Sequence, residues 1–130
     1  MTITLESAIM IIIKENKKDL DTARENGMSE SMLDRLSLSE QRIKDIADAV
    51  KKIIDYDDPV GRVISGTKRP NGLLIEKVSV PLGVVAVIFE ARPNVTVDAA
   101  ALCLKSGNSV ILRGGKEAIN SNMAMAETMR

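Results

Sequence analysis

Basic side chains stand at two places where an apolar run of the sequence gives way to polar residues. Arg92 follows the run VVAVIF, and Arg113 and Lys116 follow the run NSVIL. Guanidinium and ammonium groups bind phosphate and carboxylate, so these residues predict an anionic ligand, with phosphate as the leading candidate. The alternative is that strand ends are polar only because they meet solvent, and the pattern by itself does not separate the two readings.

Two strands must position these side chains. Val84 to Phe89 is a run of mainly β-branched and aromatic residues, typical of a strand covered on both faces. Asn108 to Leu112 predicts a second buried strand, and the segment between them is helical. Such a β-α-β crossover is right-handed and makes its two strands parallel. Because an open parallel sheet binds ligands beyond the carboxyl ends of its strands, both basic groups should lie at one edge.

The helix between the strands is expected over roughly Val95 to Lys105. Asn94 or Thr96 is its predicted cap, and Ser106-Gly107 is a usual stop signal. A further helix begins near Glu117. Its N-terminus adds to the anion-binding character of the second strand's end.

The residues before this unit predict three helical stretches. Leu5 to Asn26 is helical, with a weak point near Glu15-Asn16 where one helix passes into another. It is apolar nearly all round, so it should be packed on more than one side. Ser29 to Leu36 predicts a short helix, and Ser39 opens a longer one that runs to about Ile54.

A hairpin is expected between the helices and the β-α-β unit. Arg62 to Ile64 and Leu73 to Val80 predict its strands, and Pro70-Asn71-Gly72 is a strong turn signal. The chain is therefore divided into an N-terminal helical segment (1–58), a β-hairpin (59–80) and a first β-α-β-α unit (81–130).

Composition excludes several classes of function. The 130 residues carry 18 basic and 18 acidic side chains, so no wide basic field is available for nucleic acid. The absence of histidine removes Ser-His and Cys-His nucleophile pairs and histidine metal sites, and nothing completes a ligand set around the acidic DYDDP segment, so no metal is expected. One cysteine suits a reducing cytoplasm, and neither a signal peptide nor a membrane span is visible.

Two motif readings are rejected. Gly114-Gly115-Lys116 is followed by Glu117 where a phosphate loop requires Ser or Thr, and no G-x-G-x-x-G follows either strand. Cys103 lies between leucines on the apolar helix, with no base or positive helix end near it. We interpret it as a small core residue and not as a nucleophile.

Longer stretches carry a resemblance to a known family. The chain closely resembles γ-glutamyl phosphate reductase, the proline-biosynthesis member of the aldehyde dehydrogenase superfamily, in PLGVVAVIFEARPNVTVDAA, LCLKSGN, VILRGGKEAINSN, DLDTARENGMSESMLDRL and DPVGRVISG. The resemblance covers essentially the whole chain but only the amino-terminal part of the family's pattern. It implies an α/β fold: a partial Rossmann-like parallel sheet of the aldehyde dehydrogenase type, with an N-terminal helical segment and a β-hairpin.

The resemblance implies NADPH-dependent reduction of γ-glutamyl phosphate to glutamate 5-semialdehyde, with release of phosphate. In that chemistry a thiolate displaces phosphate and hydride then reduces the thioester. The catalytic cysteine segment is expected beyond Arg130, so this fragment should be inactive alone. In relatives the hairpin belongs to an oligomerisation arm, which favours a homodimer. Two alternatives stay open: a stand-alone phosphate- or nucleotide-binding module without catalysis, and a structural piece whose polar strand ends bind nothing.

The resemblance also implies cofactor-binding roles for residues after the second strand. Arg113 falls where relatives place a basic residue that contacts the adenosine ribose of the cofactor, and Gly114 follows it in the same loop. Lys116 and Glu117 lie near the position where NAD-preferring relatives carry an acid. A basic pair of Arg113 and Lys116 favours a 2′-phosphate, and hence NADP over NAD.

Three residues compete for the place of the asparagine that stabilises the oxyanion in superfamily relatives. Alignment by counting forward from Pro81 places Arg92 at the position of this asparagine. Counting back from Gly107-Asn108 places Glu90 there, because the helix of this chain is shorter. Asn94 is the nearest amide and a candidate oxyanion donor. Arg92 is instead a candidate for holding the acyl phosphate of the substrate, unless it is paired with Glu90 or Asp98.

Overall fold

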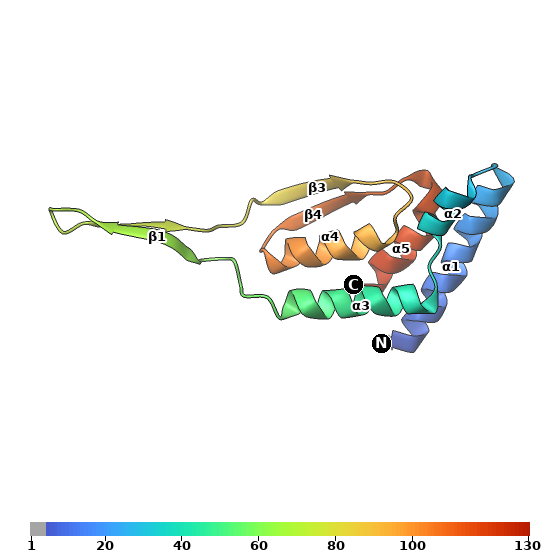
Figure 1. Cartoon of the computed structure of the whole chain (residues 1–130), viewed down its shortest axis with the longest axis horizontal. Helices are drawn as coiled ribbons and strands as arrows, with labels where there is room; N and C mark the ends of the chain where they lie inside the picture. The colour runs from blue at the N-terminus through green and yellow to red at the C-terminus, as the bar shows by residue number, and fades with distance from the viewer. Residues whose placement is uncertain (1–4) are drawn as a thin grey trace.

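A computed structural model describes residues 5–130 of the chain (Figure 1). Within these residues the elements follow the order of three helices, a hairpin, and a strand-helix-strand-helix unit. The helices gather at one end of the molecule and the hairpin projects from the other (Figure 1).

The amino-terminal helices are α1 (Leu5–Glu25), α2 (Glu30–Leu36) and α3 (Glu40–Ile54). α1 is continuous, so the predicted weak point near Glu15-Asn16 is wrong. Asn16 does not interrupt the helix because its polar side chain is buried and hydrogen-bonded to other segments of the chain. α1 ends at Glu25, next to the predicted end at Asn26: Gly27 adopts a φ of +72°, and the Met28 N–H donates to the Ala23 carbonyl at 3.0 Å.

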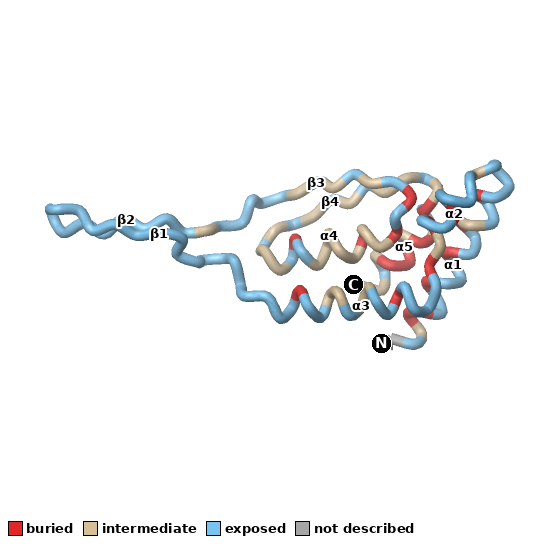
Figure 2. The backbone as a smooth tube through the Cα atoms, viewed as in Figure 1, coloured by how far each residue is buried: buried red, intermediate tan, exposed pale blue. Residues whose placement is uncertain are grey.

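The hairpin consists of β1 (Val63–Lys68) and β2 (Leu74–Val78), paired antiparallel. Gly72 has a φ of +89° in the turn, as the Pro-Asn-Gly signal predicts, and the Arg69 N–H donates to the Leu73 carbonyl at 2.8 Å. Every residue of both strands is exposed, and Figure 2 shows the hairpin lying clear of the rest of the chain.

The β-α-β unit consists of β3 (Val84–Ile88), α4 (Asn94–Lys105) and β4 (Ser109–Arg113). β3 and β4 pair in parallel from Val84 opposite Ser109 to Ile88 opposite Arg113, which confirms the predicted topology. Gly107, at a φ of +72°, ends α4 as expected, and the Asn108 N–H donates to the Cys103 carbonyl at 2.8 Å.

Two details of this unit differ from expectation. β3 and β4 are not covered on both faces: Val84, Ile88 and Ile111 are 67%, 75% and 61% exposed, because α4 covers only one face among the described residues. Neither Asn94 nor Thr96 caps α4. The helix begins at Asn94 itself, directly after Pro93, whose fixed φ suits a helix start.

A short 3-10 helix η1 (Lys116–Ala118) leads into α5 (Ile119–Thr128), which packs along α1. The core lies among the helices and away from the sheet (Figure 2). Its main cluster consists of buried side chains from α1, the α2–α3 turn, α3 and α5: Ile9, Ile12, Leu38, Ile43, Ala124 and Met125. No helix within residues 5–130 is long and apolar enough to cross a bilayer.

Candidate functional site

The ends of the two parallel strands lie at one edge of the sheet. Ile88 is opposite Arg113, and the Phe89 N–H donates to the Arg113 carbonyl at 3.0 Å. The loop after β3 and the loop after β4 therefore start side by side. This is the edge where the sequence predicted that the basic residues would meet.

The loop after β3 turns sharply at Ala91. Ala91 is buried and holds a φ of +39°, the single positive φ of a non-glycine residue among those described. Its N–H donates to the Glu117 carboxylate at 2.7 Å. The turn separates its neighbours, since Glu90 lines one cavity and Arg92 lines another. Glu117, expected to face a cofactor, is therefore engaged in holding this turn.

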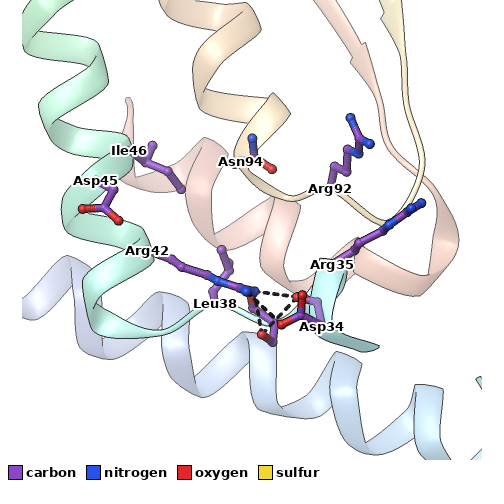
Figure 3. Close-up of a pocket in the computed structure, with 9 residues that line it drawn as sticks. Asp34, Arg35, Leu38, Arg42, Asp45, Ile46, Arg92 and Asn94 are labelled. Atoms are coloured by element: carbon purple, nitrogen blue, oxygen red, sulfur yellow. Dashed lines mark hydrogen bonds and ion pairs between the residues drawn. The ribbon is translucent and has the colours of Figure 1, made fainter. Parts of the chain in front are cut away.

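Arg92 and Asn94 face a cavity of about 380 Å³ that also receives residues from α2, α3 and the turn between them. We call it the arginine cavity, because Arg35 and Arg42 line it as well. In Figure 3, Arg35 and Arg92 lie at one end of this lining and Asp45 lies at the other. Asn94 donates to Asp98 within α4 at 3.1 Å, which leaves one amide hydrogen uncommitted.

The three arginines of the cavity differ in their interaction partners. Arg42 pairs with the Asp34 carboxylate at 2.8 Å and donates to the Ser37 carbonyl at 3.0 Å, so it ties the α2–α3 turn together (Figure 3). Arg35 and Arg92 are exposed and form no ion pair within residues 5–130. The alternative in which Arg92 pairs with Glu90 or Asp98 is therefore not realised.

Lys116 and Glu117 line a second cavity, of about 690 Å³, between α1, α2 and the start of α5. Glu90, Asp19 and Asn120 contribute further polar groups to this lysine cavity. Arg113 is exposed at the end of β4 but lines neither this cavity nor the arginine cavity. The predicted basic residues thus share an edge of the sheet without sharing a cavity.

The N-terminus of α5 is already occupied by a carboxylate. Asp19 of α1 is 3% exposed, and it accepts hydrogen bonds from the Ser121 N–H at 2.8 Å and from the Asn120 N–H at 3.2 Å. The positive end of the α5 dipole stabilises this buried charge. The N-terminus of α5, which the sequence suggested as a phosphate site, is therefore already filled by the Asp19 carboxylate.

Sequence reasoning missed Asp19 and the nearby Asn16. Asn16, 2% exposed, donates to the Leu36 carbonyl at 2.8 Å and accepts from the Leu38 N–H at 2.8 Å. The available signal was a polar residue at a helical spacing from apolar ones, which marks a buried polar group with partners elsewhere. The partners themselves come from other segments and leave no local signal.

Internal packing leaves little room for a side chain at either glycine after β4. A side chain at Gly114 would collide with Asn122, which accepts a hydrogen bond from Thr96 at 3.0 Å. A side chain at Gly115 would collide with the Glu117 carboxylate. Gly114 therefore brings the backbone close to α5, and Gly115 leaves space for the carboxylate that holds the Ala91 turn.

Cys103 lines neither of the two cavities. Cys103 is buried on α4, consistent with a core residue. No cluster of three or more potential ligands that could hold a metal ion is present within residues 5–130. On the solvent side of α3, a hydrogen bond from Lys44 lowers the pKa of Glu40, and one from Lys51 lowers the pKa of Asp48.

Comparison with known proteins identifies relatives of this chain. No family model matches the sequence. The chain is 64% identical over 116 residues to a γ-glutamyl phosphate reductase of Clostridium perfringens, and 54% identical over all 130 residues to one of Geobacter sp.. These alignments cover 89% and 100% of the chain but 28% and 31% of the relatives, so the chain spans less than a third of their length.

Solved structures agree with the sequence comparison. A crystal structure of γ-glutamyl phosphate reductase from Thermotoga maritima superposes with a TM-score of 0.89 at 45% identity, over 92% of this chain and 29% of that one. The Saccharomyces cerevisiae enzyme superposes with a TM-score of 0.90 at 38% identity, over 95% and 32%.

The fold and the polar strand ends define an α/β chain of the class that binds ligands beyond the carboxyl ends of parallel strands. Within that class the agreement is specific. The chain is similar to γ-glutamyl phosphate reductases over 89–100% of its length, and it corresponds to less than a third of such a reductase. Nothing in the comparisons favours an independent phosphate-binding module.

Proposed function

We propose that this chain is part of an NADPH-dependent reductase that converts γ-glutamyl phosphate to glutamate 5-semialdehyde in proline biosynthesis. The observation that carries the proposal is the identity of 54–64% to γ-glutamyl phosphate reductases over 89–100% of the chain. In the balanced reaction, an acyl phosphate, NADPH and a proton give an aldehyde, NADP⁺ and inorganic phosphate. The presence of a single cysteine supports a reducing, cytoplasmic setting.

Arg113 and Lys116 are the proposed cofactor-binding residues. Both are exposed and have no ion pair within residues 5–130, so their charge fits a 2′-phosphate. Gly114 lets the β4 loop run close against α5. When bound, NADPH supplies the hydride. Glu117 contributes by fixing the Ala91 turn, since its carboxylate is already committed there.

Arg92 and Asn94 are the proposed substrate-side residues. The Arg92 guanidinium stabilises the phosphate as it leaves, and the uncommitted amide hydrogen of Asn94 donates to the carbonyl oxygen as negative charge develops on it. Cys103 takes no part, because it is buried on α4. The nucleophilic thiolate that the chemistry requires is not supplied by these 130 residues.

Substitution in a reductase of full length that carries these residues tests the cofactor assignment. Arg113→Ala with Lys116→Ala should reduce the preference for NADPH over NADH in kcat/KM by roughly tenfold or more, since two charge-assisted contacts to the 2′-phosphate are lost. Lys77→Ala, an exposed lysine on β2, is the matched control. An unchanged preference would refute the assignment, and absence of reductase activity in the unsubstituted enzyme would refute the function.

The exposed hairpin supports a homodimer. Its strands leave apolar side chains in solvent, among them Ile64 at 59% and Ile75 at 51% exposure. Both outer edges of the two-stranded sheet are unpaired among the described residues. Such an edge is a ready template for pairing with another chain.

A further inference from the structure

Arg35, on α2, lies outside the residues assigned to the cofactor and the substrate. It lines the arginine cavity together with Arg92, although the two residues lie on different elements (Figure 3). Neither guanidinium has a carboxylate partner within residues 5–130. An unpaired guanidinium retains all its donors for a ligand, and two arginines that line one cavity favour a group with two negative charges.

The surroundings of Arg35 keep it available. Asp34, its neighbour in the chain, is the acidic group closest in sequence, but it is paired with Arg42 at 2.8 Å. The Arg42 guanidinium also donates to the Ser37 side chain at 2.9 Å. Because Arg42 neutralises Asp34 and braces the α2–α3 turn, the cavity retains the positive charges of Arg35 and Arg92 at one end.

The opposite end of the cavity has the opposite character. Asp45 lies there, away from both free arginines (Figure 3), and accepts one hydrogen bond from Gln41 at 2.9 Å. A carboxylate has room for further donors. The cavity, of about 380 Å³, is therefore positive at one end and negative at the other, which suits a small ligand that carries both signs of charge.

We infer that Arg35 and Arg92 together form a phosphate subsite, and that Arg35 is a substrate-binding residue recruited from α2. The identity of the ligand rests on the proposed function: γ-glutamyl phosphate carries an acyl phosphate at one end and, at the other, an α-amino acid group with one ammonium and one carboxylate. The phosphate binds between Arg35 and Arg92, and the ammonium group lies toward Asp45.

Inorganic phosphate is the probe for a first experiment on the 130-residue chain. Titration followed by NMR should shift the side-chain Nε–H signals of Arg35 and Arg92. Arg35→Ala and Arg92→Ala should each weaken binding by about five- to tenfold, because each removes one charge-assisted partner. Arg62→Ala, an exposed arginine next to the hairpin, is the control and should leave binding unchanged. Binding that is insensitive to Arg35→Ala, or no shift of either side chain, would overturn the inference.

A second experiment separates this inference from the proposed function. In a full-length reductase carrying these residues, the reverse reaction consumes inorganic phosphate, so its KM for phosphate reports on the same subsite. Arg35→Ala should raise that KM about tenfold while leaving the KM for NADP⁺ unchanged. If the enzyme is active and the KM for phosphate is unchanged, the subsite is wrong and the function stands. If no activity is found but phosphate binding depends on Arg35, the subsite stands and the function is wrong.

Discussion

At the scale of single residues, Glu117 shows how a side chain near a candidate cofactor site is used to shape a loop. Its carboxylate accepts the Ala91 N–H at 2.7 Å, and Gly115 leaves the space that it occupies. The loop that carries Arg92 and Asn94 therefore depends on a residue that follows β4. This hydrogen bond couples the loop after β3 to the segment after β4.

Removal of this acceptor should be measurable as a loss of stability. Glu117→Ala is expected to lower the free energy of unfolding by about 1–3 kcal/mol, because a buried N–H then lacks a partner. Glu117→Gln retains an acceptor oxygen and should lose less. Denaturant unfolding and hydrogen exchange of the Ala91 amide are the measurements. Glu127→Ala, at an exposed glutamate of α5, is the control, and an equal effect of the two alanine substitutions would contradict the role of Glu117.

At the scale of elements, α5 is capped by a residue of α1 and not by its own sequence. Ala118 stands at the N-cap and offers no side-chain oxygen, while the Asp19 carboxylate accepts from the Ser121 hydroxyl at 2.6 Å and from the Asn120 amide at 2.8 Å. A buried carboxylate is tolerated there because hydrogen bonds and the helix dipole replace water.

Substitution of the cap should destabilise the packing of α1 against α5. Asp19→Ala leaves buried donors unpaired and is expected to cost about 2 kcal/mol or more in the free energy of unfolding. Asp21→Ala is the matched control on the same helix, since its side chain is 55% exposed. Thermal and denaturant unfolding compare the two variants. Similar losses for both would show that the Asp19 contacts contribute little.

The ends of α1 and α4 offer a second comparison between elements. Gly27 and Gly107 share a φ of +72°, where an alanine costs about 1–2 kcal/mol. Gly27 has open space around it, whereas a side chain at Gly107 would approach Pro81 Cγ to 2.9 Å and Val60 Cγ2 to 3.2 Å. Gly107→Ala should therefore lower the melting temperature more than Gly27→Ala. Equal decreases in melting temperature would mean that Pro81 and Val60 move aside without loss of stability.

At the scale of the whole molecule, the helices are packed and the strands are not. The buried side chains gather around α1, α3 and α5, while the hairpin and one face of the β3–β4 sheet remain exposed (Figure 2). The apolar pattern of β3 predicted cover on both faces because apolar residues are usually buried. Burial depends on which elements lie against a strand, and in the described residues only α4 does so.

Exposed apolar surface should drive self-association of the chain. If the hairpin is the contact, Ile75→Lys should shift the sedimentation profile toward monomer, because a charge in a paired strand edge is costly. Met10→Lys, at a residue of α1 that is 74% exposed, tests the other large apolar surface. Analytical ultracentrifugation at several concentrations distinguishes them. If only Met10→Lys shifts the profile toward monomer, the hairpin is not the contact between copies.

The sequence by itself determined the features that depend on neighbouring residues. The turns at Gly27, Gly72 and Gly107 follow from the freedom of glycine at positive φ, and the parallel pairing of β3 with β4 follows from the crossover between them. It also indicated which strand ends carry basic residues. Each of these features depends on residues close together in the sequence, so one short segment is sufficient to predict it.

Only the tertiary structure decided how the candidate site is divided. Arg92 shares its cavity with Arg35 and not with Lys116, because the chain turns at Ala91 and because α2 packs beside that turn. The Asp19 carboxylate fills the helix end expected to bind phosphate, through contacts between residues 102 positions apart. No local pattern encodes such contacts, since they arise from the packing of distant segments against one another.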